Sequence, residues 1–245
     1  MKRQARAELA LAPAMAGAVA EPLRLPRTLP RGHHRLARDV VLLSQRSRLI
    51  EGIVAAVAEK GYAATTVADV TARAGVSRAT FYEQFADKED CFLSAYDQGA
   101  RVHLDHVAAA GREPRDSLER LRASLRVYLE VLAAEPAYAR TFIREVGAAG
   151  PRALQSQVEV QRRYAALLRE WHDGVRGQHP QVVALPDEFF VAAVGAVTEL
   201  VADCVRREQT HRLAALEPVL LRVLTSLLGA QALLEAERTT VPMGG

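Results

Sequence analysis

The stretch GVSRATFYEQFADKED, residues 75–90, decides the fold. Gly75 suits the left-handed conformation that ends a helix, and Ser77 is a typical N-cap for the next one. A helix that ends at Gly75 and a helix that begins after Ser77 have the spacing of a helix-turn-helix. Phe81 and Phe85 are four residues apart and share one face of the second helix, which predicts that this face is buried.

The flanking sequence continues the helical pattern. Thr66 and Asp69 have the spacing of a capping-box variant, and Asp87 caps the helix after the quoted stretch. No stretch alternates like a strand, so the fold is predicted to be all-α with about nine helices. The predicted helices are residues 47–60, 67–74, 78–85, 88–110, 114–134, 136–146, 151–173, 187–209 and 212–237.

Positive charge is concentrated at the N-terminus. Residues 1–50 contain ten Lys and Arg against three Asp and Glu, a net charge of +7, whereas the whole chain carries +3. Residues 1–44 are rich in Pro, Arg and Ala and are predicted to form a flexible arm. Such an arm favours a polyanionic partner, and the alternative is a solvated tail that binds nothing.

Composition limits the compartment. The chain of 245 residues is 49% hydrophobic and 25% charged, which is typical of a soluble globular protein. Cys91 and Cys204 give neither a disulfide framework nor a metal-site spacing, which fits a reducing cytoplasm. Residues 1–20 faintly resemble a signal peptide, but Glu8 and Pro13 disfavour export. No stretch is apolar enough for a membrane span, so we expect a cytoplasmic protein with no membrane partner.

No motif argues for catalysis. Residues 75–79 loosely match a nucleophile elbow, but a helix precedes them where the elbow needs a strand. His103 and His106 are three residues apart and could share a metal, but two ligands without a third are a weak signal. The prediction is a protein that is not an enzyme and needs no cofactor and no metal.

Lys88 is a cation at the start of a predicted helix, where the macrodipole disfavours it. A bound phosphate would resolve this, because it would accept from the free N–H groups and the ammonium together. The alternative is an ion pair with a nearby carboxylate, for which the candidates are Asp87, Glu89 and Asp90.

Residues 61–97, GYAATTVADVTARAGVSRATFYEQFADKEDCFLSAYD, resemble the DNA-binding domain of the TetR family of bacterial transcriptional regulators. The shared pattern is long and ungapped, and the resemblance extends over about residues 45–97. It implies a helix-turn-helix DNA-binding domain over residues 45–92 and a helical ligand-binding and dimerisation domain over residues 93–238. Residues 239–245 are predicted to be a disordered tail.

By this resemblance, a dimer would bind a pseudo-palindromic DNA operator with its third helix in the major groove. Base contacts are expected from Arg78, Ala79 and Thr80, and Arg78 could bind guanine in bidentate fashion. Phosphate contacts are expected from Thr66, Tyr82, Gln84 and Lys88.

Two features modify this expectation. Glu83 departs from the aromatic or basic residue that family members often carry. A carboxylate beside phosphates is repulsive unless it accepts from a cytosine amino group or pairs with an arginine. Residues 45–90 hold six cations and seven anions, so they supply little electrostatic attraction. We therefore hypothesise that the arm enters the minor groove. Its arginines are Arg27, Arg31, Arg35 and Arg38.

The resemblance also implies an apolar cavity for an unknown small-molecule effector. The candidate lining residues, for which core packing is the alternative, are His103, Tyr128, Phe142, Tyr164, Trp171 and Phe190. The last two predicted helices carry small residues such as Gly195 and many leucines. This favours a homodimer with a four-helix interface over an intramolecular core. The leucines are Leu220, Leu221, Leu224, Leu227 and Leu228.

The resulting prediction is a repressor that is released from DNA when an effector shifts the fourth helix, with activation or ligand-independent binding as variants. One alternative is a helical ligand-binding or interaction protein without sequence-specific DNA binding. Another is an enzyme that uses the C-terminal cavity. Specific, salt-sensitive DNA binding separates the first from a regulator, and turnover of a bound molecule would support the second.

Overall fold

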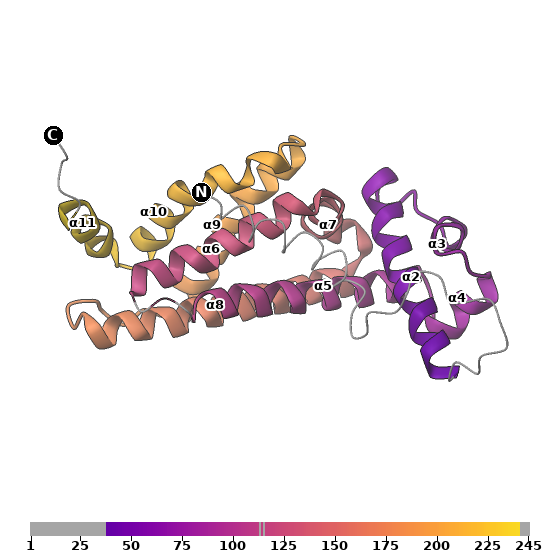
Figure 1. Ribbon diagram of the computed structural model, residues 1–245, viewed down its shortest axis with the longest axis horizontal. Helices are drawn as coiled ribbons and strands as arrows, with labels where there is room; N and C mark the ends of the chain where they lie inside the picture. The colour runs from indigo at the N-terminus through magenta and orange to yellow at the C-terminus, as the bar shows by residue number, and fades with distance from the viewer. Residues whose placement is uncertain (1–37, 113, 115, 241–245) are drawn as a thin grey trace, which may run out of the picture. The chain divides into compact units, whose positions relative to one another are not determined.

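The computed structural model describes residues 38–112, 114 and 116–240, with side chains from residue 41 to 235, and over this range it contains helices and no strands (Figure 1). This confirms the predicted all-α fold. None of the described helices is both long enough and apolar enough to cross a membrane. The α-helices are α2 Arg38–Lys60, α3 Val67–Ala74, α4 Arg78–Gln84, α5 Lys88–Ala110, α6 Ser117–Ala134, α7 Pro136–Ala139, α8 Pro151–Gln178, α9 Asp187–Arg206, α10 Glu217–Leu227 and α11 Gln231–Thr240. Shorter turns are the π-helical η1 Arg140–Arg144 and the 3₁₀ turns η2 Val146–Ala149 and η3 Thr210–Leu216.

The chain folds into two compact units. The first unit extends to Val102 and also includes Glu135–Ser156, so a segment that follows α6 in the sequence packs with the N-terminal helices. The second unit comprises His103–Ala134 and the residues from Gln157 onward. Helix α5 is one continuous helix whose residues are shared between the two units.

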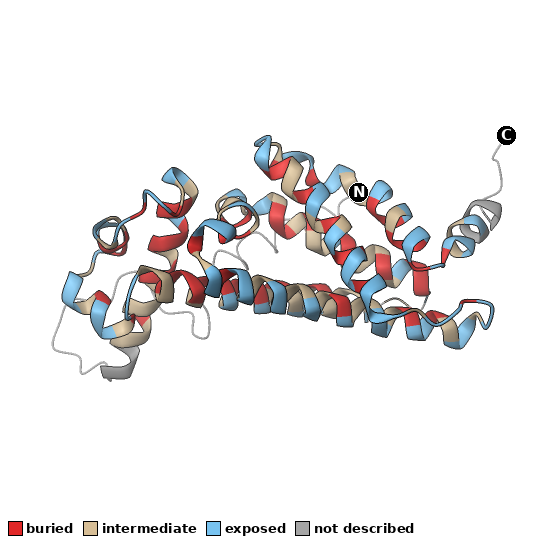
Figure 2. Cartoon of the chain, turned by 180° about the vertical axis from the view of Figure 1, so that it is seen from behind, coloured by how far each residue is buried: buried red, intermediate tan, exposed pale blue. Residues whose placement is uncertain are grey.

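The core of the first unit is built on α2. Leu49, Ile53 and Val57 are four residues apart and at most 1% exposed, so they form the buried face of α2 (Figure 2). Full burial of such side chains stabilises a fold by about 1.5–3 kcal/mol each. Gly52 lets α3 approach closely, because a Cβ atom there would lie 2.9 Å from the carbonyl oxygen of Val70. Any larger residue at position 52 would push α3 away from α2.

The core of the second unit is built on α6, which packs against η3 and α10. Its buried leucines recur every three or four positions, as expected of an amphipathic helix. They are Leu118, Leu121, Leu125, Leu129 and Leu132. From the opposing elements, Leu213 and Leu220 are 0% exposed.

Helix α2 begins at Arg38, nine residues before the predicted start at residue 47. The prolines that disfavour a helix in the arm end at Pro30, so they do not reach this segment. The predicted arm over residues 1–44 is therefore wrong for its last seven residues. Arg38 lies at the start of α2, and its side chain is not described. The predicted arm residues Arg27, Arg31 and Arg35 lie outside the described residues.

The predicted helix over residues 212–237 is also wrong as a single element. Residues 210–216 form the 3₁₀ turn η3, and the chain breaks between α10 and α11 at Gly229, whose φ is 65°. The N–H of Ala230 bonds to the carbonyl oxygen of Thr225 at 2.8 Å, which closes the end of α10. Likewise, the predicted helix over residues 136–146 is one α-turn followed by η1 and η2.

Candidate functional site

The turn between α3 and α4 is fixed by caps on both sides. The capping box is complete: Thr66 Oγ1 accepts from the N–H of Asp69 at 3.3 Å, and Asp69 Oδ2 accepts from the N–H of Thr66 at 2.8 Å. Gly75 ends α3 with a left-handed φ of 62°. Ser77 Oγ accepts from the N–H of Thr80 at 3.0 Å and so starts α4. The predicted helix-turn-helix is confirmed by these contacts.

Helix α4 has a buried side and an exposed side. Phe81 is 0% exposed and Phe85 is 2% exposed, as their spacing predicted. The Tyr82 ring meets Phe81 edge-on at 5.3 Å between centroids, yet Tyr82 as a whole is 52% exposed. The helix therefore presents a guanidinium, a methyl group, a phenol and a carboxylate to solvent. These belong to Arg78, Ala79, Tyr82 and Glu83.

Two arginines of α2 hold the C-terminal ends of the two helices that follow it. Arg46 donates to the carbonyl oxygen of Gln84 at 2.9 Å, and its guanidinium lies 4.2 Å from the centre of the Phe85 ring. Arg48 donates to the carbonyl oxygen of Ala74 at 3.1 Å. Positive charge is favoured at both places by the helix dipole. These arginines therefore position α3 and α4.

Lys88 holds the turn that precedes α3. Its Nζ donates to the carbonyl oxygens of Tyr62 at 2.8 Å and Thr65 at 2.9 Å, and it lies 4.1 Å from the centre of the Tyr62 ring. Burial lowers the pKa of Lys88. No carboxylate among the described residues forms an ion pair with it, so the ion-pair alternative is wrong. An ammonium has three N–H donors, and these two carbonyl oxygens accept from two of them.

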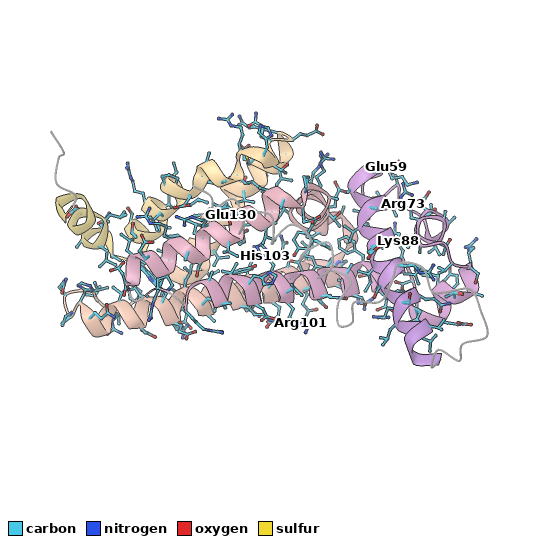
Figure 3. The ribbon with its side chains drawn as sticks, viewed as in Figure 1. Glu59, Arg73, Lys88, Arg101, His103 and Glu130 are labelled. Atoms are coloured by element: carbon cyan, nitrogen blue, oxygen red, sulfur yellow. The ribbon has the colours of Figure 1, made fainter. Side chains whose placement is uncertain are left out.

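Two further cations of the first unit are neutralised by carboxylates. Lys60 Nζ lies 2.6 Å from Asp69 Oδ1. Arg73 of α3 pairs with Glu59 of α2, and Figure 3 shows the two side chains between these helices. Hydrogen bonding from Lys60 holds the pKa of Asp69 well below its ordinary value. Exposed pairs of this kind contribute about 0–1 kcal/mol each, so their main effect here is to remove free positive charge from the surface.

Arg78 differs from the other five cations of residues 45–90. It is the first residue of α4, it is exposed, and among the described residues no carboxylate or carbonyl group pairs with it. Glu83, near the other end of the same helix, is also exposed and unpaired within the described part of the chain. Both charged side chains of α4 are therefore available to an external partner.

The other predicted contact residues have local roles as well. Thr66 Oγ1 donates to Asp69 Oδ2 at 2.6 Å, and Thr80 Oγ1 lies 3.0 Å from Ser77 Oγ, so both hydroxyl groups belong to helix caps. Gln84 is half-buried at the end of α4. Thr66 is exposed and Thr80 is half-buried, so each keeps some surface for a partner.

Three of the six candidate cavity residues form one cluster in the second unit. The imidazole of His103 stacks on Tyr128 at 5.0 Å between centroids, and Tyr164 meets Tyr128 edge-on at 5.6 Å. His103 Nε2 lies 3.2 Å from the carbonyl oxygen of Tyr128, which requires a proton on Nε2. Burial lowers the pKa of His103 to about 4 and raises that of Tyr128. The cluster combines one neutral imidazole with two phenol rings, and Figure 3 labels His103 on α5.

The other three candidates lie elsewhere. Trp171 Nε1 donates to the carbonyl oxygen of Ser117 at 2.6 Å, and Phe190 packs edge-on against His172 at 5.4 Å, so each has a role in packing. Phe142 belongs to the first unit, where its ring contacts other aromatic rings of that unit. In the described residues, no group of three or more His, Cys, Asp or Glu side chains could hold a metal ion.

Helices α9 and α10 expose apolar residues that none of the described elements of their unit covers. On α9, Phe189 is 43% and Val191 47% exposed; on α10, Val219 is 54% exposed. Gly195 is exposed too, and a Cβ atom there would meet nothing within 4 Å. The leucines that suggested an interface are mostly core residues, which corrects that part of the prediction. Leu220, Leu221, Leu224 and Leu228 are at most 2% exposed, whereas Leu227 is 37% exposed.

The first unit contains a segment whose sequence matches a known protein family. Residues 49–95 match the model of the bacterial regulatory proteins of the tetR family, which confirms the resemblance seen in the sequence. The chain is 29% identical to the HTH-type transcriptional regulator EthR of Mycolicibacterium smegmatis over 135 residues, which are 55% of this chain and 55% of EthR. The chain spans about half the length, or less, of such curated relatives. They carry the names of regulators, in agreement with the prediction that the chain is not an enzyme.

Solved structures extend the similarity of fold to the second unit. The fatty acid degradation regulator FadR from Bacillus halodurans has a TM-score of 0.66 and 24% identity, covering 72% of this chain and 96% of that one. FadR from Bacillus subtilis, solved in complex with stearoyl-CoA, has a TM-score of 0.66 and 21% identity, covering 75% of this chain and 97% of its own. Both share the all-helical fold described above.

Proposed function

We propose that the chain is a cytoplasmic, DNA-binding transcriptional regulator, since residues 49–95 match the model of the bacterial regulatory proteins of the tetR family. The observation that carries the proposal is the exposed, unpaired guanidinium of Arg78 at the first residue of α4. The N-terminal residues of the second helix of a helix-turn-helix meet base edges in the major groove. Arginine binds guanine through two hydrogen bonds, so Arg78, with Ala79 and Thr80, would read the operator.

Phosphate groups would be bound around this helix. The exposed phenol of Tyr82 supports such a contact, and the ammonium of Lys88 at the start of α5 would add to it. Thr66 and Gln84 complete the set expected from the resemblance. Because five of the six cations of residues 45–90 have internal partners, the arm with Arg27, Arg31 and Arg35, together with Arg38 at the start of α2, would supply further charge.

The regulator would bind DNA as a homodimer through α9 and α10. Glycine in a helix interior costs about 1 kcal/mol relative to alanine, and nothing within the described part of the second unit requires Gly195. Close approach of a second helix would explain it, with exposed Phe189, Val191 and Val219 supplying apolar area. The two copies of α4 would then meet half-sites about 34–36 Å apart on a pseudo-palindrome.

A small-molecule effector would act through α5, because this one helix carries both Lys88 and His103. A ligand that binds beside the cluster of His103, Tyr128 and Tyr164 would displace α5 and lower the affinity for DNA. A coupling of about 1–3 kcal/mol between the two sites suffices for a switch. The default is thus a repressor that an effector releases.

Long-chain acyl-CoA is the effector class to test first, since a structure of the same fold was solved with stearoyl-CoA. Stearoyl-CoA would raise the midpoint of thermal unfolding and release DNA, whereas coenzyme A alone would do neither. A shift with both compounds would point to recognition of the nucleotide portion alone. No shift with either would exclude this class while leaving DNA binding untouched.

The test of the regulatory function is selection of bound sequences from a random duplex library with the full-length chain. We expect a pseudo-palindrome that contains a guanine read by Arg78. Arg78→Ala would lose that guanine preference, a loss of about 1–3 kcal/mol, whereas Arg101→Ala, which removes an exposed arginine of α5, would not. Failure of the wild-type chain to enrich any sequence would favour a helical ligand-binding or interaction protein.

A further inference from the structure

Glu83 is placed on the side of α4 that points directly away from its unit. Successive residues of a helix are rotated by about 100°, so residues two positions apart lie on nearly opposite faces. Phe81 is 0% exposed and fixes the buried face. Ala79 and Glu83, two positions before and after Phe81, therefore share the opposite face, and both are exposed.

This face is the one that would lie deepest in a groove. Arg78 and Tyr82 are three residues before and one residue after Phe81, so they lie to one side of that face, nearer the edge of the helix surface. A side chain at the centre of an inserted helix meets base edges, and Tyr82 at the side would meet the sugar–phosphate backbone. Arg78 is the first residue of α4, and its long side chain would still reach base edges from that end of the helix. Glu83 is thus positioned at base edges, where the repulsion from phosphate groups is least.

A carboxylate there needs a donor. In the described part of the chain Glu83 forms no ion pair, since five of the six cations of residues 45–90 have other partners and the sixth, Arg78, does not pair with it. This removes the internal arginine partner that would neutralise Glu83. In the major groove, the donors are the amino groups of cytosine and adenine, and carboxylates select cytosine because adenine also presents an acceptor, N7, beside its amino group.

We infer that Glu83 determines specificity by accepting a hydrogen bond from the amino group of a cytosine in each operator half-site. This inference rests on the proposed DNA-binding function, and it adds a cytosine to the guanine that Arg78 would read in each half-site. The Ala79 methyl group, one turn before Glu83, leaves room for the base pair beside it. Any other base at the cytosine position would leave a carboxylate facing an acceptor or a methyl group, which lowers affinity.

The experiment is sequence selection with the full-length wild type and three variants. With Glu83→Gln, the preferred base at one position of each selected half-site would change from cytosine to adenine, because a glutamine amide binds adenine in bidentate fashion. Glu83→Ala would lose preference at that position only. Glu51→Gln, which removes one carboxylate from α2 of the same unit, would leave the motif unchanged. Thermal unfolding of each variant confirms that it is folded.

Binding constants on matched duplexes give the second readout. Wild type would bind the cytosine duplex at least about fivefold more tightly than the adenine duplex, and Glu83→Gln would reverse the order. An unchanged motif in Glu83→Gln, or a uniform gain in affinity for every sequence, would overturn the inference, since the carboxylate would then act only by repulsion. A wild-type chain that enriches no sequence would contradict the proposed function itself, and that failure is visible before any variant is compared.

Discussion

The carboxylate of Glu145 accepts a hydrogen bond from the main-chain N–H of Tyr62 at 3.0 Å, across 83 residues of sequence. The same turn is held from its other side by Lys88, which donates to the carbonyl oxygens of Tyr62 and Thr65. Gly61, with a φ of 79°, brings the chain within reach of Glu145. The turn that leads into α3 is therefore fixed by a residue of the segment after α6 and by a residue of α5.

Glu145→Ala should loosen this turn. The N–H of Tyr62 would lose its acceptor, at a cost of about 1–3 kcal/mol in the free energy of unfolding. Glu145→Gln keeps an acceptor oxygen and should cost less. Hydrogen exchange of the Tyr62 amide and chemical denaturation measure both effects, with Glu188→Ala on the exposed side of α9 as the control. Unchanged exchange in Glu145→Ala would show that the bond does not hold the turn.

Lys88→Met should lower both stability and DNA affinity. Two carbonyl oxygens lose their donor, which costs roughly 1–3 kcal/mol. Loss of one phosphate contact should also reduce the slope of log K against log salt by about 0.9. Salt titration of operator binding separates the two roles. An unchanged slope with a lower unfolding midpoint would mean that Lys88 acts only within the fold.

The free energy of unfolding should fall as the pH is lowered from about 6.5 to about 4. In this range His103 takes up a proton in the unfolded chain but not in the folded one. The pKa of His103 is lowered from 6.5 to about 4 by burial, so the folded state holds the neutral imidazole. The contribution of the neutral His103 to the free energy of unfolding is fully present above pH 6.5 and is lost toward pH 4. The loss amounts to about 3 kcal/mol.

His103→Phe keeps a stacked ring without a titrating proton and should flatten the dependence of unfolding free energy on pH in this window. His211→Phe, at an exposed position of η3, should not. His172 is also buried with a lowered pKa and would account for a residual slope. Identical pH profiles for wild type and His103→Phe would contradict the assignment.

Gly195→Leu should break the dimer and leave the fold of each chain intact. The new side chain meets nothing within its own unit, so only a partner helix can clash with it. Gly174→Leu is the matched control, because Gly174 is also helical and exposed with open space around it. Sedimentation velocity and circular dichroism give the two readouts. A dimeric Gly195→Leu variant would place the interface elsewhere.

Local signals predicted the helix-turn-helix well. The caps at Thr66 and Ser77 and the left-handed glycine at Gly75 depend on residues within four positions of one another, so the sequence pattern specifies them directly. The buried pair Phe81 and Phe85 follows from the period of the helix. For the same reason, the resemblance to a regulator family was carried by this segment and not by the second unit.

Contacts over long sequence distances could not be predicted. Arg46 binds the carbonyl of Gln84 and Glu145 binds the N–H of Tyr62, and no local pattern connects either pair. Lys88 was expected at a phosphate because a cation opposes the helix dipole, but carbonyl groups from another turn already accept from it. Leu220 and Leu224 were assigned to an interface because the amount of apolar surface, without the fold, does not say which side is covered.

Most arginine and lysine side chains of the first unit's residues 45–90 bind groups of the protein itself, and this affects how such a regulator would search a chromosome. Affinity for random DNA comes almost entirely from lysine and arginine on phosphates, and a genome offers about 10⁶–10⁹ competing sites. Because Arg46 and Arg48 already hold carbonyl groups, and Lys60 and Arg73 pair with carboxylates, the folded domain contributes little to that background binding. A larger fraction of the molecules would then stay free in solution, and a small number of copies per cell would be enough to keep one operator occupied.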